Sequence, residues 1–381
     1  MTLKLVLSVE ALSSSLTGIG RYTWELAHRL PVHAQMQDVR FYRAGCWIEE
    51  PARLLKAPAV AVSARARKPL FRIKQPRWLR DWQSSVRCKD RVFHGPNFFL
   101  PACAEAGVAT VHDLSVFKYP ETHPQERIRH FERDFKDSMA RASHLITDSE
   151  ATRAEVMDFL SWPAEKITAV PLGVSSKFSP ASFSAVTPIL DKYHLAYKKY
   201  ALCVSTMEPR KKISNLLLAY ECLPPYVRGM YPLVLIGGRG WLSDELHQKI
   251  EHLAARGWLR YLGFVPEGDL PALYAGAHSF IYPSIYEGFG LPVLEAMASG
   301  VPVVASKFTS LPEVTQGAAL LVDPEDIDAL SHAVHKNLCD ENWRAAACTA
   351  GVSIAQGFTW SRCVDRTMDV YRKLCADSAL F

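Results

Sequence analysis

Short apolar runs recur along the chain and are separated by longer amphipathic stretches. In the first half the runs lie at residues 3–9, 39–43, 92–94, 108–112, 145–147 and 167–170. In the second half they lie at residues 200–205, 233–236, 258–265, 280–283 and 301–305. Continuous apolar runs of this length are typical of buried strands in parallel sheets, with helices in the segments between them. The pattern predicts an α/β protein in which strands and helices alternate.

The length and the spacing of these runs favour two domains. At 381 residues the chain is longer than a single typical core requires. We expect a Rossmann-like N-terminal domain over residues 1–175 and a second Rossmann-like domain over residues 176–360. Residues 361–381 are predicted to form a helix that packs back on the first domain. The two doubly wound sheets would then face a central cleft.

The composition is that of a globular protein, with 49% hydrophobic and 22% charged residues. No apolar run reaches the ~18 residues that a membrane span requires. The strand-like start has a short apolar part and no cleavage site, so we expect no signal peptide and a cytoplasmic protein. The nine cysteines are scattered without a Cys-x-x-Cys pair, which argues against a disulfide framework and against a zinc site.

Positive charge is concentrated between residues 63 and 83. The segment from Arg65 to Trp82 carries seven basic residues and one acid, with aromatic and aliphatic side chains between them. Basic residues interleaved with tryptophans suit an anionic membrane surface. A nucleic-acid site has a similar pattern, but no nucleic-acid motif accompanies it. A solvated basic loop with its tryptophans in the core is the third interpretation, and Pro69 and Pro76 argue against one continuous membrane-lying helix.

The stretch from Ser284 to Ser306 is the most informative part of the chain. A glycine-containing loop joins the run at 280–283 to a predicted helix over residues 292–298, and the next apolar run follows. Units of this kind bind phosphates and sugars with loop amides and a helix N-terminus. Glu287 lies on the loop and Glu295 on the helix, so both could meet ligand hydroxyls. In the alternative interpretation Glu287 caps the helix and Glu295 is solvated.

A second pair of glycines lies near the N-terminus. Gly18 and Gly20 follow the first predicted strand and precede a helix predicted from Arg21 to Leu30. The third glycine of a dinucleotide fingerprint is missing, so NAD binding is poorly supported. We favour a close approach of the loop amides to an anionic group or to an acceptor.

Polar residues also follow two of the predicted strands. His94 and Asn97 come after the run at 92–94, and His112 and Asp113 end the run at 108–112. The carboxyl ends of strands line the ligand crevice of open α/β sheets. At this place His112 could hydrogen-bond a ligand hydroxyl, with Asp113 orienting its ring. Alternatively, the histidine is satisfied by backbone groups at the strand end.

A basic turn lies in the second half. Arg210 and Lys211 stand between the run at 200–205 and a helix predicted over residues 213–220. Cations beside a helix N-terminus suit a diphosphate, to which an arginine can donate two parallel hydrogen bonds. A solvated basic turn is the alternative interpretation.

Together these motifs carry a family resemblance. The turn Glu208-Pro-Arg-Lys211 and the pattern Glu287-x7-Glu295 resemble those of the retaining glycosyltransferases of family 4, which have the GT-B fold. Further similar segments, in the family's order, are Gly18-Ile-Gly20, His112-Asp113, Val170-Pro-Leu-Gly-Val174 and Gly263-Phe-Val265. The resemblance thus covers most of the chain, and it is strongest to bacterial mannosyltransferases of polysaccharide assembly.

The resemblance implies roles for the matched residues. The C-terminal half would hold a nucleotide sugar, with Arg210 and Lys211 on the diphosphate, Glu287 on the sugar hydroxyls and Glu295 on the ribose. Further donor contacts would come from Gly18, Gly20, Val265, Gly288, Phe289, Gly290 and Leu291. The catalytic set would be His112, Arg210, Lys211 and Glu287, and the acceptor would meet His94, Asn97 and Asp113. Many family members have Gly-Arg in place of Val204-Ser205, so Arg210 would carry more of the diphosphate binding.

The resemblance also implies the chemistry. The family retains anomeric configuration, and two glutamates that both hold the donor do not suit a double displacement. We expect a front-face transfer without metal or cofactor, in which the departing diphosphate takes the acceptor proton and Arg210 and Lys211 stabilise its charge. The donor would be GDP-mannose, or alternatively a UDP-sugar. The competing interpretations are an epimerase or phosphorylase-like enzyme of the same fold and a non-catalytic GT-B assembly partner.

The same resemblance implies partners and a location. The acceptor would be a lipid-linked glycan, and the segment Arg65–Trp82 would bind the anionic inner face of the cytoplasmic membrane. Other polysaccharide-assembly enzymes would be further partners, and no nucleic acid is expected.

Overall fold

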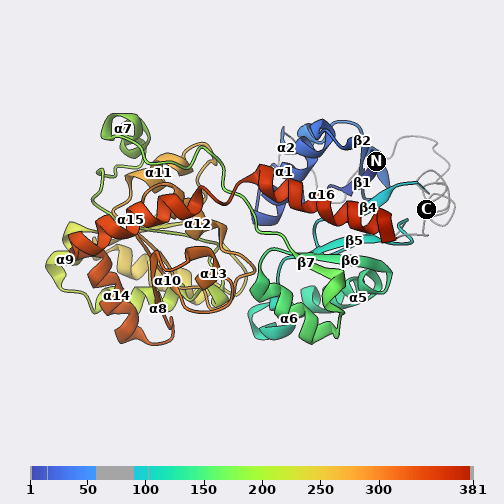
Figure 1. Cartoon of the computed structure of the whole chain (residues 1–381). Coiled ribbons are helices and arrows are strands. Elements are labelled where there is room, and N and C mark those ends of the chain that lie inside the picture. The colour runs from blue at the N-terminus through green and yellow to red at the C-terminus, as the bar shows by residue number, and fades with distance from the viewer. Residues whose placement is uncertain (1, 15, 57–89, 102, 378–381) are drawn as a thin grey trace, which may run out of the picture.

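The computed structural model describes residues 2–14, 16–56, 90–101 and 103–377. The basic segment Arg65–Trp82 lies outside the described residues. Two α/β units lie side by side and are joined by two crossing segments (Figure 1). The two parallel-sheet units form the GT-B architecture that the alternating apolar runs and the family resemblance predict.

The first unit contains a seven-stranded sheet in the order β3-β2-β1-β4-β5-β6-β7. Its strands are β1 (Leu3–Ser8), β2 (Met36–Arg43), β3 (Cys46–Ile48), β4 (Val92–Gly95), β5 (Gly107–Val111), β6 (Ala142–Thr147) and β7 (Ile167–Ala169). Neighbouring strands pair in parallel, except that β3 pairs antiparallel with β2 at the edge. The apolar pattern missed β3 because this strand is short and none of its side chains is buried.

Helices cover both faces of this sheet. They are α1 (Gly18–Arg29), α2 (Ala52–Lys56), α4 (Ser115–Lys118), α5 (Gln125–Arg141), α6 (Glu150–Leu160) and α16 (Trp360–Asp377), with short 3-10 turns η1 (Leu30–Val32), η3 (Pro120–Thr122) and η4 (Ala164–Lys166). Leu5 and Leu7 of β1 join one hydrophobic cluster with α1 and α16, whereas Val6 joins another with α5 and α6. Successive side chains of a strand point to opposite faces, so one strand serves both cores.

The second unit contains a wholly parallel six-stranded sheet in the order β10-β9-β8-β11-β12-β13. Its strands are β8 (Ala201–Val204), β9 (Leu233–Ile236), β10 (Leu259–Tyr261), β11 (Ser279–Tyr282), β12 (Val303–Ser306) and β13 (Ala319–Val322). Its helices are α7 (Phe183–Lys192), α8 (Ile213–Glu221), α9 (Pro225–Met230), α10 (Asp244–Ala254), α11 (Leu270–Gly276), α12 (Leu291–Ala298), α13 (Leu311–Thr315), α14 (Ile327–Cys339) and α15 (Glu341–Ala355), with the 3-10 turn η5 (Pro209–Lys211). The apolar runs did not include β13, whose side chains are only partly buried.

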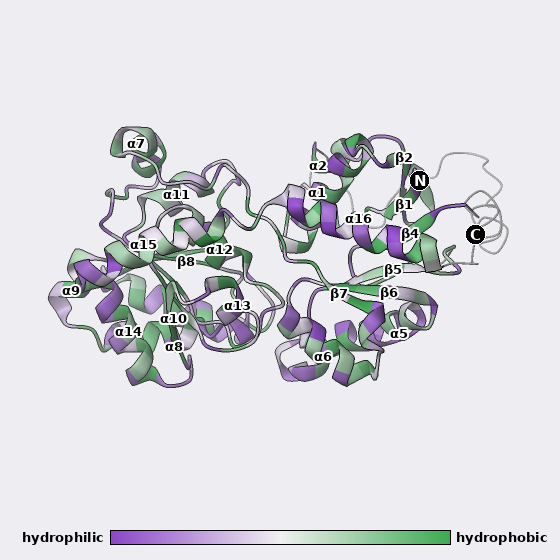
Figure 2. Cartoon of the chain, viewed as in Figure 1, coloured by the Kyte–Doolittle hydropathy of each residue, from purple (hydrophilic) through white to green (hydrophobic). Residues whose placement is uncertain are grey.

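The hydropathy of the elements follows this layering. In Figure 2 the strands β7 and β8 are mainly hydrophobic, whereas α14 and α16 carry both hydrophobic and hydrophilic residues. A helix with one apolar face is what a sheet-covering position requires. Among the described residues, none of the helices combines the length and the apolar character that crossing a bilayer would need.

The two units are connected where the chain crosses twice. The chain leaves the first unit after β7 and returns just before α16, which contacts α1 and β6. Val174 and Thr359 form an isolated parallel bridge between the two crossing segments. A Cβ atom on Gly173 would lie 2.2 Å from the backbone nitrogen of Trp360, so only glycine permits this approach. The crossing segments therefore form a tightly packed hinge between the units.

Candidate active site

The loop between β11 and α12 brings Glu287 against the basic turn. The carboxylate of Glu287 accepts hydrogen bonds from the ammonium of Lys211 and from the hydroxyl of Tyr282, which lies 3.0 Å away. Nη1 of Arg210 lies 3.6 Å from the same carboxylate. The helix α12 begins after Gly290, whose φ is 103° and which gives no side-chain cap. Glu287 thus binds cations and does not cap the helix.

The basic turn η5 is fixed to this loop and is not a solvated segment. Nη1 of Arg210 donates to the carbonyl of Tyr286 at 2.8 Å, and the carbonyl of Arg210 accepts from the amide of Ile285 at 3.0 Å. Lys211 is buried. Residues 76 positions apart are therefore held in one cluster before any ligand arrives.

The charges in this cluster stabilise one another. Burial alone would raise the pKa of Glu287, but the cations of Lys211 and Arg210 outweigh it and hold that pKa below its usual value. Burial and the neighbouring Arg210 lower the pKa of Lys211. Burial also acts to lower the pKa of Arg210, yet the carboxylates of Glu287, Asp113 and Glu208 raise it. The site therefore holds an ionised glutamate that bonds to Lys211 and faces the guanidinium of Arg210.

Glu295 lies one helical turn further into α12 and is only 7% exposed. Burial raises its pKa to about 7, although the nearby Arg21 acts in the opposite direction. Arg21 comes from α1 of the first unit, and its Nη1 lies 2.9 Å from the carboxylate of Glu267 in the second unit. Sequence reasoning missed Arg21 and Glu267. The sequence indicated them only by position, because Arg21 directly follows Gly20 and Glu267 stands two residues after Val265.

The glycines of the first loop differ in their roles. A Cβ atom on Gly18 would lie 3.8 Å from Leu291, so Gly18 lies against the start of α12. Gly20 is buried, and its amide donates to the hydroxyl of Thr17, the N-cap of α1. The helix begins at Gly18, three residues earlier than predicted. The amide of Gly20 thus serves the helix cap, and its contact with the donor stays a prediction.

His112 is held from both sides of its ring. Its Nδ1 lies 2.7 Å from a carboxylate oxygen of Asp148, and its Nε2 lies 2.8 Å from the carbonyl of Pro96. Burial acts to lower the pKa of His112, but the carboxylate of Asp148 outweighs it and raises that pKa. Nε2 donates to Pro96, since a carbonyl oxygen can only accept. Asp148 and not Asp113 therefore orients the ring, which corrects the prediction made from the sequence.

The backbone of His112 nevertheless lies against the loop that carries Glu287. A Cβ atom on Gly288 would approach the carbonyl oxygen of His112 to 1.7 Å. The carbonyl of Gly288 accepts hydrogen bonds from the hydroxyls of Ser149, at 2.8 Å, and Thr152, at 3.2 Å. The loop carrying Glu287 is thus packed directly on the strand ends of the first unit. Both ring nitrogens of His112 already have partners, so neither is free to bind a sugar in this arrangement.

His94 is not available to an acceptor. It is fully buried, with Nδ1 2.6 Å from the hydroxyl of Tyr371 and Nε2 2.8 Å from that of Thr110. Burial lowers its pKa to about 3, so the ring is neutral. The predicted acceptor role of His94 is therefore wrong, because α16 covers this strand end. Asn97 and Asp113 are partly exposed and stay predicted acceptor residues.

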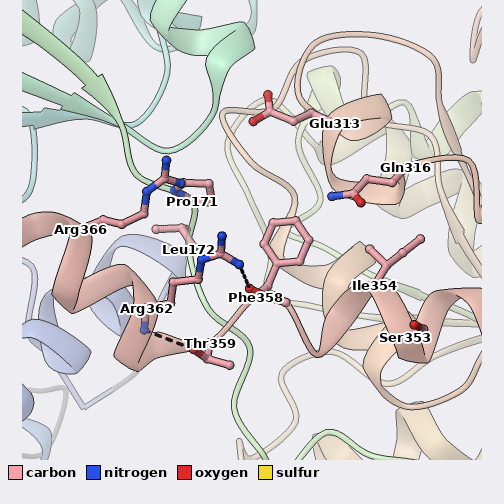
Figure 3. Close-up of a pocket in the computed structure, with 11 residues that line it drawn as sticks. Pro171, Leu172, Glu313, Gln316, Ser353, Ile354, Phe358, Thr359, Arg362 and Arg366 are labelled. Carbon is pink, nitrogen blue, oxygen red and sulfur yellow. Dashed lines mark hydrogen bonds between the residues drawn. The ribbon is translucent and has the colours of Figure 1, made fainter.

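A cavity of about 490 Å³ opens beside the hinge, away from the predicted site residues. Arg362 and Arg366 project from α16 toward Pro171, and Glu313 of α13 lies on the far side (Figure 3). The carboxylate of Glu313 accepts from the amide of Glu150, at 3.0 Å, at the start of α6. The cavity therefore lies at the boundary between the two units.

The acidic, histidine and cysteine side chains do not form a metal site in the described residues. In the described part of the chain no three His, Cys, Asp or Glu side chains are grouped so that they could hold a metal ion. One Asp-x-Asp sequence, Asp326-Ile-Asp328, begins α14, where Asp326 caps the helix by accepting from the amide of Ala329 at 2.9 Å. That sequence therefore has a structural role at a helix start.

Comparison with known proteins agrees with this geometry. A model of glycosyl transferases group 1 matches residues 191–351, and one of Glycosyltransferase Family 4 matches residues 16–178. The O-antigen chain mannosyltransferase B of Escherichia coli is 42% identical over 98% of this chain and 100% of its own length. The serotype-specific mannosyltransferase WbdA of Escherichia coli is 29% identical over 71% of this chain and 34% of its own length.

Solved structures share the fold at lower identity. The structure of Anabaena Alr3699/HepE in complex with UDP and glucose has a TM-score of 0.71 and 18% sequence identity, over 97% of this chain and 99% of that one. Two facing parallel α/β units with a glutamate loop and a basic turn at their junction define a GT-B glycosyltransferase. The chain belongs to glycosyltransferase family 4, together with the O-antigen mannosyltransferases.

Proposed function

We propose that this glycosyltransferase moves mannose from GDP-mannose to a hydroxyl of a lipid-linked O-antigen glycan, with retention of configuration. The observation that carries the proposal is the cluster of Glu287, Lys211 and Arg210 on the loop that begins α12. The near full-length similarity to an O-antigen mannosyltransferase supports mannose as the sugar and O-antigen as the product.

The cluster suits a diphosphate next to a sugar. Arg210 and Lys211 would bind the diphosphate and stabilise the charge that develops as the glycosidic bond breaks, which such fixed cations do well in a buried site. Glu287 would exchange its bond with Lys211 for hydroxyls of the mannose, assisted by the amides of Gly288 to Leu291. Glu295 would bind the ribose, and the segment after Val265 would lie along the base.

The proposed use of the glutamates argues against a double displacement, so we propose that retention comes from a front-face transfer. A retaining double displacement needs a free carboxylate nucleophile, whereas Glu287 is held by two cations and Tyr282. The acceptor oxygen would form its bond to the anomeric carbon as the bond from that carbon to the diphosphate oxygen breaks. The departing diphosphate oxygen would take the proton of the acceptor hydroxyl. We propose that this step needs no metal, because Arg210 and Lys211 supply the positive charge. Ser205, which stands where many family members have an arginine, is buried.

The proposed location is the inner face of the cytoplasmic membrane, where a lipid-linked acceptor lies. The basic segment Arg65–Trp82 would bind anionic headgroups there, alongside other polysaccharide-assembly enzymes. Salt-sensitive co-sedimentation of the protein with anionic vesicles is the expected result. Equal sedimentation with neutral and anionic vesicles would contradict the membrane role of this segment.

A transfer assay tests the proposal. Purified protein with EDTA, GDP-mannose and a lipid-linked mannoside should form an α-mannoside, identified by NMR of the product, while UDP-glucose should give none. Thermal shifts should rank GDP above UDP, ADP and TDP, since a ligand at about 100 times its dissociation constant adds about 2.7 kcal/mol to the free energy of unfolding. Formation of hydrolysed or epimerised sugar nucleotide without any glycoside would favour the epimerase interpretation. The absence of any reaction would favour a non-catalytic role.

A further inference from the structure

Within the described residues, three buried polar atoms that make no hydrogen bond lie together beside the Glu287 cluster. They are Nδ1 of His123, Oε2 of Glu208 and Nε of Arg210. Nε of Arg210 and Oε2 of Glu208 form an ion pair at 3.5 Å but no hydrogen bond, so each still has its hydrogen-bonding capacity free. Buried polar atoms are nearly always paired in native structures, so a group of unpaired atoms at one place indicates a missing polar partner.

His123 belongs to the segment that follows the strand end of His112. It lies directly after η3 and is 4% exposed, and its Nε2 is 3.2 Å from the hydroxyl of Ser115. The amide of Ser115 in turn donates to the carboxylate of Asp113 at 2.8 Å. Burial, Arg127 and Arg210 lower the pKa of His123, so its ring is neutral near pH 7. With Nε2 engaged by Ser115, Nδ1 is left to face a ligand.

The second unit supplies the opposite wall of this place. The indole nitrogen of Trp241 donates to the carbonyl of Thr122 at 2.6 Å, and its ring centroid lies 5.5 Å from that of His123. Arg127 covers the Trp241 ring at 4.8 Å. A Cβ atom on Gly240, next to Trp241, would lie 2.6 Å from Cγ of Glu208. The residues of both units thus converge on the same small volume.

We propose that His123, Glu208 and Nε of Arg210 form a subsite for hydroxyl groups of the acceptor's terminal sugar, with Trp241 as its wall. The subsite offers both hydrogen-bond donors and acceptors, which suits neutral vicinal hydroxyls, each of which donates and accepts. A phosphate fits poorly because Glu208 and Asp113 place negative charge there. This inference rests on the proposed function and adds a named acceptor site to it.

The subsite also depends on closure of the cleft. His123 and Thr122 come from the first unit, whereas Glu208, Arg210 and Trp241 come from the second. An acceptor would therefore be held only while the units are together, which is also when Glu287 lies against the first unit. The donor would then meet an ordered hydroxyl in place of bulk water.

Two substitutions of His123 separate binding from a structural role. An asparagine places its amide near the position of Nδ1 and loses the bond to Ser115, whereas a glutamine reaches Ser115 and loses Nδ1. His123→Gln should raise the KM for the acceptor at least about tenfold, the value of one good hydrogen bond, with the affinity for GDP unchanged by calorimetry. His123→Asn should recover most of that loss. His130→Asn, an exposed histidine on α5, is the matched control.

The subsite would be overturned if His123→Gln left the KM for the acceptor unchanged. It would also be overturned if His123→Asn raised that KM as much as His123→Gln does, because the ring would then be structural. A parallel loss of GDP affinity would also overturn it, because the group would then belong to the donor site. If the wild type transfers no mannose, the proposed function fails by itself. Saturation-transfer NMR with methyl α-mannoside and GDP then tests the subsite directly. Signal in the wild type and none in His123→Gln supports the subsite, and equal signals in the two proteins refute it.

Discussion

The two units present different chemistry at their shared cleft, although both are parallel α/β sheets. In the second unit, Glu287 and Lys211 are buried charges that satisfy one another and could exchange their partner for a ligand. In the first unit, His94 and His112 have both ring nitrogens bound inside the unit. Similar strand ends can thus carry a ligand site in one unit and a stabilising network in the other.

The largest expected effect is that of Glu287→Gln. The amide keeps the shape but loses the charge that faces Lys211 and Arg210 and that we propose orders the sugar. We expect kcat/KM for mannosyl transfer to fall roughly a thousandfold, about 4 kcal/mol of transition-state stabilisation. Glu251→Gln, an exposed glutamate on α10, should be neutral. Activity within threefold of wild type would mean that the charged cluster of the second unit is not the site.

The cluster of Glu287, Arg210 and Lys211 could be predicted from the sequence because its residues lie in short contiguous motifs. Glu287 and Glu295 share one loop and helix, and Arg210 and Lys211 share one turn, so motif order placed them together. The surroundings of the histidines in the first unit could not be predicted, because their hydrogen-bond partners lie far away in the sequence. His94 is bound by Tyr371, 277 positions away, and His112 by Asp148, 36 positions away. His123 and Glu208 stand out only as unpaired buried atoms, which no spacing reveals.

The next effect tests the first unit. Asp148→Asn removes the carboxylate that supports the His112 ring, and breaking such a buried pair should lower the free energy of unfolding by about 3 kcal/mol. Urea unfolding measures this, with the exposed Asp158→Asn on α6 as control. The folded state raises the pKa of His112, so the pair stabilises below the unfolded pKa of about 6.5 and loses that contribution as pH rises through the folded pKa.

The difference between Asp148→Asn and wild type should therefore shrink at alkaline pH. GDP affinity should stay unchanged, because Asp148 supports a ring that has no free atom for the donor. If GDP affinity instead fell with stability unchanged, His112 would be a ligand group, and the contrast between the units would fail.

A smaller effect concerns the pH dependence set by Glu295. Its folded pKa of about 7 lies above the unfolded value of 4.5, so its contribution to stability is present at acid pH and is lost as pH rises through 7. Integration of that shift gives a loss of about 2 kcal/mol between pH 5 and pH 7. Glu295→Gln should remove this slope from thermal or urea unfolding. Glu313→Gln, on the neighbouring helix α13, is the control. If that variant flattened the slope equally, the assignment to Glu295 would be refuted.

The smallest expected effect lies between the units, at the ion pair of Arg21 and Glu267. The Arg21 side chain is 14% exposed and that of Glu267 50%, so water screens the pair. A double-mutant cycle with Arg21→Gln and Glu267→Gln should give a coupling of about 0.5 kcal/mol in unfolding, falling with added salt. A coupling above about 1.5 kcal/mol that ignores salt would mean a desolvated pair. The first unit would then contribute a buried charge of the same kind as Lys211, and the cleft would be ionic on both sides.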